Sequence, residues 1–388
     1  MSKRIYLDYN ATTPLSPEVR DFYVKELDRY ANGSSLHEDG RLAAKDIETA
    51  RAQVAALAHV QSEEIIFTSG GSESNNTVFN TMAELAKKKG RSVIVTTQIE
   101  HPCVMESSKR LASQFGLEVI YVPVDEYGVV RDREFDAALL KQPLLVSVMT
   151  ANNEIGTIQH IKSLCSRAHA AGALFHTDAV QAAGKIPIDL ADWDVDYATF
   201  SCHKIYGPKG VGALFVKKNA PLEPFIRGGH QEHGFRAGTY NGPAIAAYGL
   251  AAELALKGLD SYAAHTKALR TKLRDGLMAR IPNIRINGHP EQVLPNTLDV
   301  SFPGAEGEAI LLHLDLLGVD VSTGSACASG SLEPSHVLMA IGLGPELAHG
   351  SIRFSFGKYN TEADVDYILD KFPPVIENLR RMSTVKAQ

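Results

Sequence analysis

The chain has 388 residues, with 39 Lys and Arg against 45 Asp and Glu, and a formal net charge of −6. Hydrophobic residues make up 44% and charged residues 22%, which is ordinary globular usage and excludes a disordered or fibrous chain. The mild acidity argues against a basic surface for nucleic acid or a membrane, and four cysteines are too few for a disulfide framework. The length predicts two domains, each with its own core.

The N-terminal sequence MSKRIYLDYNATTP has no apolar h-region and no small-residue cleavage site, so we expect no secretory signal. The most apolar stretch, AIAAYGLAAELAL, is interrupted by Tyr248 and Glu253 and is shorter than the roughly 18 apolar residues of a membrane helix. We therefore expect a cytoplasmic protein with reduced thiols and with neither a membrane nor a nucleic-acid partner.

Short β-branched runs alternate with helical stretches over the first part of the chain. The strand candidates are 64–68, 92–97, 118–124, 144–150, 173–178, 196–201 and 211–216, and helical periodicity lies between them, as in 73–89 and 161–171. This alternation predicts an α/β fold with βα units around a buried, mostly parallel sheet. The loop 202–210 is too short for a crossover helix, so its two flanking strands are predicted to be antiparallel.

A second α/β set is predicted toward the C-terminus. A Gly-rich stretch at 227–242 is followed by a long helical segment over 243–280, which stops at Pro282. Beyond it we expect strands at 296–302 and 351–356, a helix near 306–317 and a last helix from Thr361. The sequence therefore predicts a large domain linked by a helix to a smaller C-terminal domain.

Two candidate functional groups follow strands of the predicted sheet, where ligands bind in such folds. Gly70, Gly71 and Ser72 follow the first strand and open a helix, so they form either a phosphate cradle or a plain N-cap. Asp178 ends another strand, with Gln181 three residues later. A carboxylate at the mouth of a buried strand is costly without a cationic partner, although a capping role accounts for it equally well.

Two further groups follow other strands of the same sheet. Lys204 comes after Ser201, Cys202 and His203; an amine that has lost solvation there is a candidate for Schiff-base chemistry, whereas most lysines are merely solvated. His101 precedes a helix-starting proline, where it either caps that helix or stacks on a planar cofactor.

These four loops bring a phosphate cradle, a buried acid, an amine and an imidazole to one edge of the sheet. Pyridoxal phosphate requires this set, because it needs a Schiff-base lysine, a carboxylate for its pyridine nitrogen and donors for its phosphate. The coincidence of all four predicts a pyridoxal-phosphate site.

A candidate nucleophile and a candidate carboxylate clamp lie in the C-terminal part. Cys327 is surrounded by small residues in VSTGSACASGSL, which is typical of a loop with an exposed thiol. Arg353 interrupts an alternating strand, either in a surface salt bridge or as a fork for a substrate carboxylate. His230 and His233 lack a nearby third ligand, so we expect no structural zinc site.

These residues resemble the cysteine desulfurases, which are fold-type-I pyridoxal-phosphate enzymes that serve nitrogenase and general iron–sulfur assembly. The matching stretches run in family order from Tyr6 to Asp366 and include YLDYNATTP, FTSGGSESNN, EHPCV, ANNEIGT, HTDAVQAAGKIPIDL, FSCHKIYGPKGVGALFV, RGGHQEHGFRAGT, STGSACASGSLEPSHV and SIRFSFGKYNTEADVD. The resemblance implies a large domain over 15–258 with a mostly parallel seven-stranded sheet. It also implies a small domain from 1–14 and 259–388, which carries the catalytic-cysteine loop at about 321–333.

The resemblance also implies roles for individual residues. Lys204 would hold the cofactor covalently and move the substrate Cα proton. Asp178 would pair with the pyridine nitrogen and Gln181 with the ring phenolate oxygen, while His101 would stack on the ring and act as acid and base. Cys327 would take the sulfur of L-cysteine as a persulfide, with alanine as the other product.

The remaining implied site residues bind the cofactor phosphate and the substrate. The cofactor-binding set would include Gly71, Ser72, Ser201, Cys202 and His203, with Thr239 contributed by the other subunit of a homodimer. Asn153 and Arg353 would hold the substrate carboxylate. The resemblance implies no required metal, and the one metal contact it allows is that of Cys327 with a transient iron–sulfur cluster. The expected protein partner is an iron–sulfur scaffold or another sulfur acceptor.

Two alternatives remain open. The first is a selenocysteine lyase or C–S lyase of the same fold, which needs no acceptor cysteine. The second is a cofactor-free sulfur-relay or scaffold partner that has kept the fold without the chemistry.

Overall fold

The computed structural model describes residues 4–323 and 333–382. Its larger sheet has seven strands in the order β2-β8-β7-β6-β5-β3-β4. Strand β8 is antiparallel to both of its neighbours, and the other pairs are parallel, which confirms the predicted mostly parallel sheet and its antiparallel pair. The strands are β2 (Ile65–Thr68), β3 (Val93–Thr97), β4 (Glu118–Val122), β5 (Leu145–Ser147), β6 (Leu174–Asp178), β7 (Tyr197–Ser201) and β8 (Gly212–Val216).

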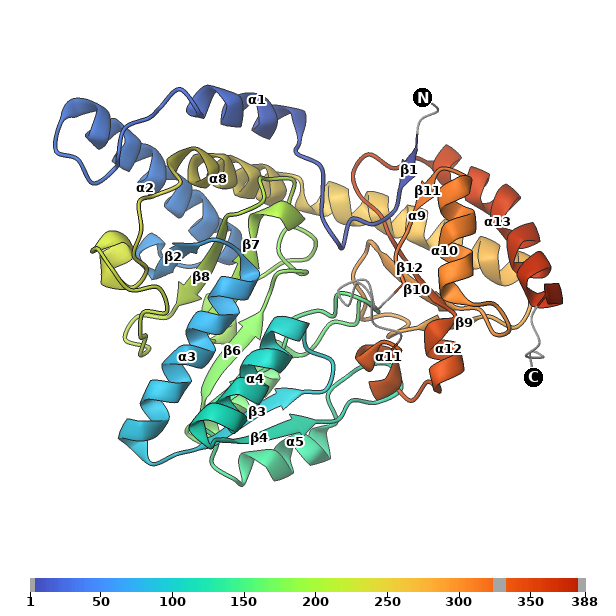
Figure 1. Cartoon of the computed structure of the whole chain (residues 1–388), viewed down its shortest axis with the longest axis horizontal. Helices are drawn as coiled ribbons and strands as arrows, with labels where there is room; N and C mark the ends of the chain where they lie inside the picture. Colours follow the sequence, from blue (N-terminus) through green and yellow to red (C-terminus); the bar gives the residue numbers. More distant parts are fainter. Residues whose placement is uncertain (1–3, 324–332, 383–388) are drawn as a thin grey trace.

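Helices cover both faces of this sheet, because consecutive strand residues point to opposite sides and apolar residues occupy both sides. Ile65 and Phe67 pack in one core cluster and Ile66 in another. The first cluster draws on α2 (Glu38–Ala58), α5 (Asp132–Leu139), α6 (Ile161–Ala170) and α8 (Gly242–Lys257), and the second on α3 (Gly71–Lys89) and α4 (Pro102–Phe115). Figure 1 shows α3 and α4 in front of the sheet. Helix α1 (Pro17–Glu26) packs on α8, and the short α7 (Leu190–Trp193) lies beside α6.

The prediction of a single helix over 243–280 is wrong at Gly258, where the helix is interrupted. The chain forms α8 up to Lys257 and α9 (Leu259–Arg280) after a break at Gly258. Gly258 has φ −95° and ψ 5°, outside the helical region, and a Cβ there would lie 3.2 Å from the Leu254 carbonyl oxygen. Glycine tolerates this crowded break, and the apolar periodicity on either side gives no sign of it.

The C-terminal part has a second, smaller sheet with its own core. Its strands are β9 (Arg285–Asn287), β10 (Thr297–Ser301) and β12 (Ser351–Ser355), in the antiparallel order β12-β10-β9. A parallel pair, β1 (Ile5–Tyr6) and β11 (Val319–Asp320), joins the N-terminal segment to this part. The helices α9, α10 (Gly307–Leu316) and α13 (Glu362–Met382) contribute apolar side chains to its core cluster.

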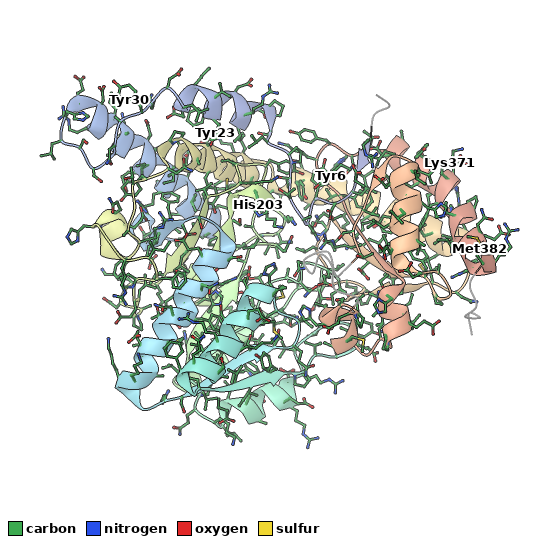
Figure 2. The ribbon with its side chains drawn as sticks, in the orientation of Figure 1. Tyr6, Tyr23, Tyr30, His203, Lys371 and Met382 are labelled. Carbon is green, nitrogen blue, oxygen red and sulfur yellow. The ribbon has the colours of Figure 1, made fainter. Side chains whose placement is uncertain are left out.

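We propose the division into 15–258 and 1–14 with 259–388 for this chain, supported by the separate core clusters and by the two parts visible in Figure 1. One segment of the C-terminal part packs with the larger core: Val337 and Leu338 of α11 (His336–Ala340) and Ala348 of α12 (Pro345–His349) join that cluster. Figure 2 shows His203 near the middle of the molecule, with Tyr30 and Met382 at opposite ends.

Within residues 4–323 and 333–382, no helix combines the length and the apolar character that a membrane crossing requires.

Candidate active site

The parallel strands of the large sheet all end at one edge, and a predicted site residue ends or follows each of five of them. Gly71 comes after β2, His101 after β3 and Asn153 after β5, while Asp178 and Ser201 are the last residues of β6 and β7. The topology therefore brings these residues to the same edge, as sequence reasoning predicted.

Lys204 ends a short 3-10 turn, η2 (Cys202–Lys204), that directly follows β7. Its Nζ donates hydrogen bonds to the backbone oxygens of Asn10 and Ala11, the latter at 2.7 Å. The N-terminal segment, which pairs with the small part through β1, thus reaches back to the lysine of the large sheet.

Asp178 is 5% exposed and accepts two hydrogen bonds. Asn75 Nδ2 of α3 donates to its Oδ2 at 2.7 Å, and the amide of Val180 donates to its Oδ1 at 3.0 Å. The second bond is a local Asx-type turn; in the described structure no helix begins here, so the alternative that Asp178 caps a helix is wrong. The bond from Asn75 is long-range and fixes the carboxylate at the sheet edge.

His101 caps α4: its Nδ1 accepts from the amide of Cys103 at 3.2 Å. The Cys103 thiol lies 2.9 Å from the same nitrogen, and burial raises the pKa of that thiol to about 12, so the thiol keeps its proton and donates it. Burial also lowers the pKa of His101, with Lys204 and His336 adding to the effect and Asp178 opposing it. The neutral imidazole therefore carries its proton on Nε2, the nitrogen opposite the cap.

Two glycines form the turn between β2 and α3, at positions that other residues would not tolerate well. Gly70 has φ +153°, a conformation that side chains rarely adopt, and a Cβ there would lie 3.8 Å from Ser201 Oγ. A Cβ on Gly71 would meet Val180 Cγ2 at 3.0 Å. The start of α3, including Ser72, leaves backbone N–H groups without helical partners, which suits an anion.

His203 and Cys202 face different surroundings in η2. His203 Nδ1 lies 3.1 Å from Thr12 Oγ1, and burial lowers the pKa of His203 to about 4, with Lys204 next in effect. The Cys202 side chain is fully buried in the large core, and a Cβ on Gly207 would lie 2.0 Å from its Sγ. Its thiol is therefore turned away from the edge and takes no part in the ligand set that we propose below.

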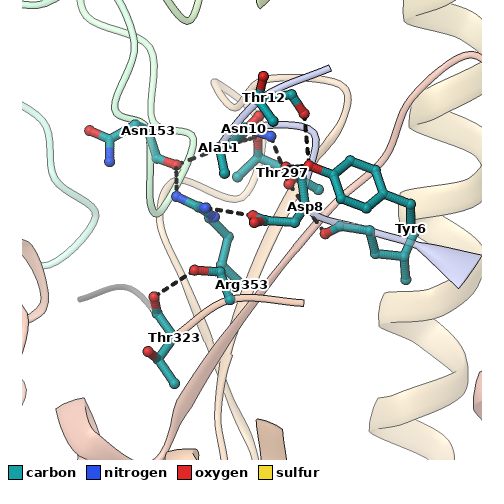
Figure 3. A network of polar contacts seen from close by, with 12 residues as sticks. Tyr6, Asp8, Asn10, Ala11, Thr12, Asn153, Thr297, Thr323 and Arg353 are labelled. Carbon is teal, nitrogen blue, oxygen red and sulfur yellow. Dashed lines mark hydrogen bonds and ion pairs between the residues drawn. The ribbon is translucent and has the colours of Figure 1, made fainter. Parts of the chain in front are cut away.

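Arg353 lies in β12 with 3% exposure. Its Nη2 forms an ion pair with Asp8 Oδ1 at 2.8 Å, and its Nη1 donates to the Asn153 backbone oxygen at 3.0 Å (Figure 3). Its Nε is buried without a hydrogen-bond partner among the described residues. An unpaired guanidinium N–H is costly in isolation, and it suits a carboxylate that binds to the free edge of the fork.

Burial reduces the negative charge that two carboxyl groups near Arg353 carry at neutral pH. Burial raises the pKa of Glu154, which accepts a bond from Ser335, to about 8, and that of Asp299 to about 7. Asp8 is therefore the principal counter-charge among these neighbours, and the guanidinium keeps the capacity to attract a further anion.

The remaining predicted residues have these positions. Gln181 is 5% exposed and donates from Nε2 to the Asn10 backbone oxygen at 3.0 Å. Thr239 is exposed in the Gly-rich loop. Cys327 lies outside the described residues, but Ser322, five positions before it, pairs with Arg353 through both backbone hydrogen bonds. In the part of the chain that the structure describes, no group of three or more His, Cys, Asp or Glu side chains could hold a metal ion.

Sequence reasoning missed three buried polar residues of this edge: Asn10, Asn75 and Lys185. Asn10 is the most connected of them, because its side chain and backbone bond to residues of both parts of the molecule. All three lie within the stretches YLDYNATTP, FTSGGSESNN and HTDAVQAAGKIPIDL, so the family resemblance was the available signal.

Comparisons with known proteins agree with this arrangement. Residues 5–368 match the family model "Aminotransferase class-V". The chain is 46% identical over 391 aligned positions to "Cysteine desulfurase IscS" of Dictyoglomus turgidum, covering 100% of this chain and 98% of the relative. It is 47% identical to "Cysteine desulfurase 2" of Trichormus variabilis, covering 98% and 94% of the two chains.

Solved structures give the same result. A chain described as "NIFS-LIKE PROTEIN" superposes with a TM-score of 0.90 at 41% identity, covering 97% of this chain and 100% of that one. A structure described as "SspA in complex with cysteine" has a TM-score of 0.80 at 32% identity, covering 92% and 100%. The chain therefore belongs to the class-V aminotransferase family and, within it, to the NifS- and IscS-like cysteine desulfurases.

Proposed function

We propose that this chain converts L-cysteine and the Cys327 thiol into L-alanine and a Cys327 persulfide, with pyridoxal phosphate held at Lys204. The observation that carries the proposal is the short path between Lys204 and Arg353. Lys204 donates to the Asn10 backbone oxygen, Asn10 Nδ2 donates to the Asn153 oxygen at 3.1 Å, and Arg353 donates to that same oxygen. An amine that would hold the cofactor and a guanidinium that would bind a carboxylate, joined in this way, suit an α-amino acid that binds between them.

The class-V family uses pyridoxal phosphate, and the residues of this chain fit that group. Lys204 supplies the amine, Asp178 a buried carboxylate for the pyridine nitrogen, and Gln181 a donor for the phenolate oxygen. The phosphate would be held by Gly71, Ser72, Ser201 and His203, at the start of α3, where backbone N–H groups have no helical partners. When bound, pyridoxal phosphate supplies an electron sink that stabilises negative charge on the substrate Cα.

The chain's own residues would orient the substrate and move its protons. Arg353, together with the Asn153 side chain, would hold the carboxylate, so that Cα faces the amine of Lys204, which moves the Cα proton. The His101 imidazole, fixed by its cap with the proton on Nε2, would stack on the ring and exchange a proton there. Asn75 would keep Asp178 in place.

The Cys327 thiolate would attack the sulfur of the bound substrate. One S–S bond forms and the substrate C–S bond breaks, so the sulfur stays on Cys327 as a persulfide and the carbon skeleton leaves as alanine once it has regained protons. The support from the described residues is the pairing of Ser322 with Arg353, because the segment that carries Cys327 starts beside the proposed carboxylate clamp.

A homodimer is part of the proposal, with Thr239 reaching the phosphate of the partner's site. The loop that carries Thr239 is anchored by Glu232, which is 2% exposed and paired with the buried Arg51 at 2.7 Å. Tyr30, which is 91% exposed, lines the same hollow as Thr239, and Leu36, close to it in sequence, is 90% exposed. Exposed apolar side chains beside an anchored loop are typical of a surface that binds a partner.

The sulfur acceptor and the setting of the reaction also remain proposals. By the resemblance, the persulfide would pass to an iron–sulfur scaffold or another acceptor protein in the cytoplasm, in nitrogenase maturation or in general cluster assembly. The relatives named above are cysteine desulfurases, and this supports the substrate, L-cysteine.

The proposed function is tested by mapping the persulfide. The purified protein with pyridoxal phosphate receives one equivalent of L-cysteine, is alkylated without reductant, and is digested for mass spectrometry. We expect one additional sulfur on the peptide that contains Cys327 and stoichiometric alanine. Additional sulfur on Cys103 instead, or free sulfide with an unmodified Cys327, would contradict the proposal.

Replacing Arg353 by lysine tests the carboxylate clamp. A lysine keeps the charge but loses the fork, so we expect the KM for L-cysteine to rise by about 10- to 100-fold with a smaller change in kcat. Arg270→Lys is the matched control, because Arg270 is a buried arginine of α9 that donates to the Leu294 oxygen. An Arg353→Lys variant with an unchanged KM would show that the clamp is wrong.

A further inference from the structure

Lys185 is a buried lysine that the proposed mechanism does not use. It is 2% exposed, and the two hydrogen-bond partners of its Nζ among the described residues are side-chain amide oxygens: Gln181 Oε1 at 2.7 Å and Asn10 Oδ1 at 2.9 Å. Burial lowers its pKa well below the usual value, and the nearby Lys204 and Arg353 lower it further. Burying a lysine without a carboxylate partner destabilises the fold, so its presence here needs a reason.

The amine of Lys185 sets the orientation of two amides. A side-chain amide has one accepting oxygen and one donating nitrogen, and the two amide oxygens here accept two N–H groups of Lys185, which the neutral amine also has. Lys185 therefore turns the oxygens of Gln181 and Asn10 toward itself and their NH2 groups away. The Asn10 nitrogen then donates to the Asn153 oxygen and to Thr297 Oγ1 at 2.9 Å, and its oxygen accepts a second bond from Asn296 at 3.0 Å.

The orientation of Gln181 bears directly on the cofactor. Gln181 Nε2 has two hydrogens, and the Asn10 backbone oxygen accepts one of them. The other is left for a ligand at the sheet edge. If the amide were reversed, its oxygen would face the cofactor's anionic phenolate oxygen and repel it, while its nitrogen would face the Lys185 amine.

We propose that Lys185 is a positioning residue, which holds Gln181 with its N–H side toward the phenolate oxygen of the bound cofactor. The inference rests on the proposed function, because it assumes that pyridoxal phosphate binds at Lys204. Lys185, in the sequence GKIPID, would act through Gln181 without contacting the reacting atoms.

The test replaces Lys185 by methionine, which has a similar length and no donor. The Lys185 side chain borders a cavity of about 400 Å³, so the methionine has room. We expect the affinity for pyridoxal phosphate to fall by about tenfold, which corresponds to about 1.4 kcal/mol for one weakened hydrogen bond. We also expect the absorption of the bound cofactor to shift toward its shorter-wavelength band, because the phenolate oxygen has lost an oriented donor.

Two further variants separate positioning from a structural effect. Arg270→Met removes another buried cation, whose described partner is the Leu294 oxygen, and should leave the spectrum unchanged at a comparable loss of thermal stability. Gln181→Leu should produce the shift by itself, and adding Lys185→Met to it should change the spectrum no further. If Lys185→Met does not fold, Lys185→Gln, which keeps an N–H donor, should retain much of the wild-type spectrum.

Each outcome decides the question. A wild-type spectrum in the Lys185→Met protein, an added shift in the double variant, or a fully shifted Lys185→Gln would overturn the role of Lys185. If the wild-type chain takes up no pyridoxal phosphate, the proposed function fails and this inference fails with it.

Discussion

Replacing Lys204 by alanine is expected to abolish both covalent cofactor attachment and turnover. The variant loses the amine that holds the cofactor and moves the Cα proton, so alanine formation should fall by at least about 10³-fold. The fold should survive. Two of the lost bonds go to backbone oxygens, and one of these oxygens, on Asn10, still accepts from Gln181. Thermal unfolding checks stability, and borohydride reduction followed by peptide mapping checks attachment.

The structure provides sharp controls for this experiment. Lys209 is exposed in the same loop, and Lys209→Ala should keep full attachment and activity. Lys185 is the competing buried amine, two hydrogen bonds away from Lys204 through the backbone and side chain of Asn10. Reduced cofactor recovered on the Lys185 peptide of the wild-type protein, or on any lysine of the Lys204→Ala variant, would contradict the assignment.

The large sheet was predictable because its strands are buried on both faces. Buried parallel strands are continuous apolar runs, and helices separate them in the sequence. Asp178 and Lys204 were predictable for the same reason, since each stands where such a run ends.

The sequence pattern does not show which side chain of a turn faces the edge of the sheet. Cys202 and Lys204 share η2, and only the packing of Cys202 against Gly207 turns its thiol into the core.

The polar network was beyond local sequence patterns. Strand β1 has two residues and pairs with Val319 and Asp320, more than 300 positions away, so no hydrophobic periodicity predicts it. Asn10 follows this strand and gains its contacts only once both parts of the molecule have folded. Lys185 had no signal of its own, because a lysine before Ile186 and Pro187 is indistinguishable from a surface residue until its burial is known.

Replacing Cys327 by serine is expected to separate the two halves of the proposed reaction. Serine is a far poorer nucleophile toward sulfur than a thiolate, so persulfide formation should vanish and alanine release should fall by at least about 10³-fold. Lys204, Asp178 and Arg353 remain intact. The variant should therefore bind pyridoxal phosphate and L-cysteine normally and still exchange the Cα hydrogen of cysteine with deuterated water.

This separation distinguishes the desulfurase from the first alternative. A C–S lyase or selenocysteine lyase needs no acceptor thiol, so full alanine and sulfide release by Cys327→Ser would favour it over our proposal. Cys165→Ala is the matched control: Cys165 lies in α6, where burial raises the pKa of its thiol to about 12 and the Asp194 carbonyl lies 3.5 Å from its sulfur. Its removal should lower stability without affecting the persulfide, because a buried, protonated thiol is no nucleophile.

Loss of alanine release together with loss of Cα exchange in Cys327→Ser would instead mean that residue 327 holds the site together, and the assignment of Cys327 as sulfur acceptor would fall.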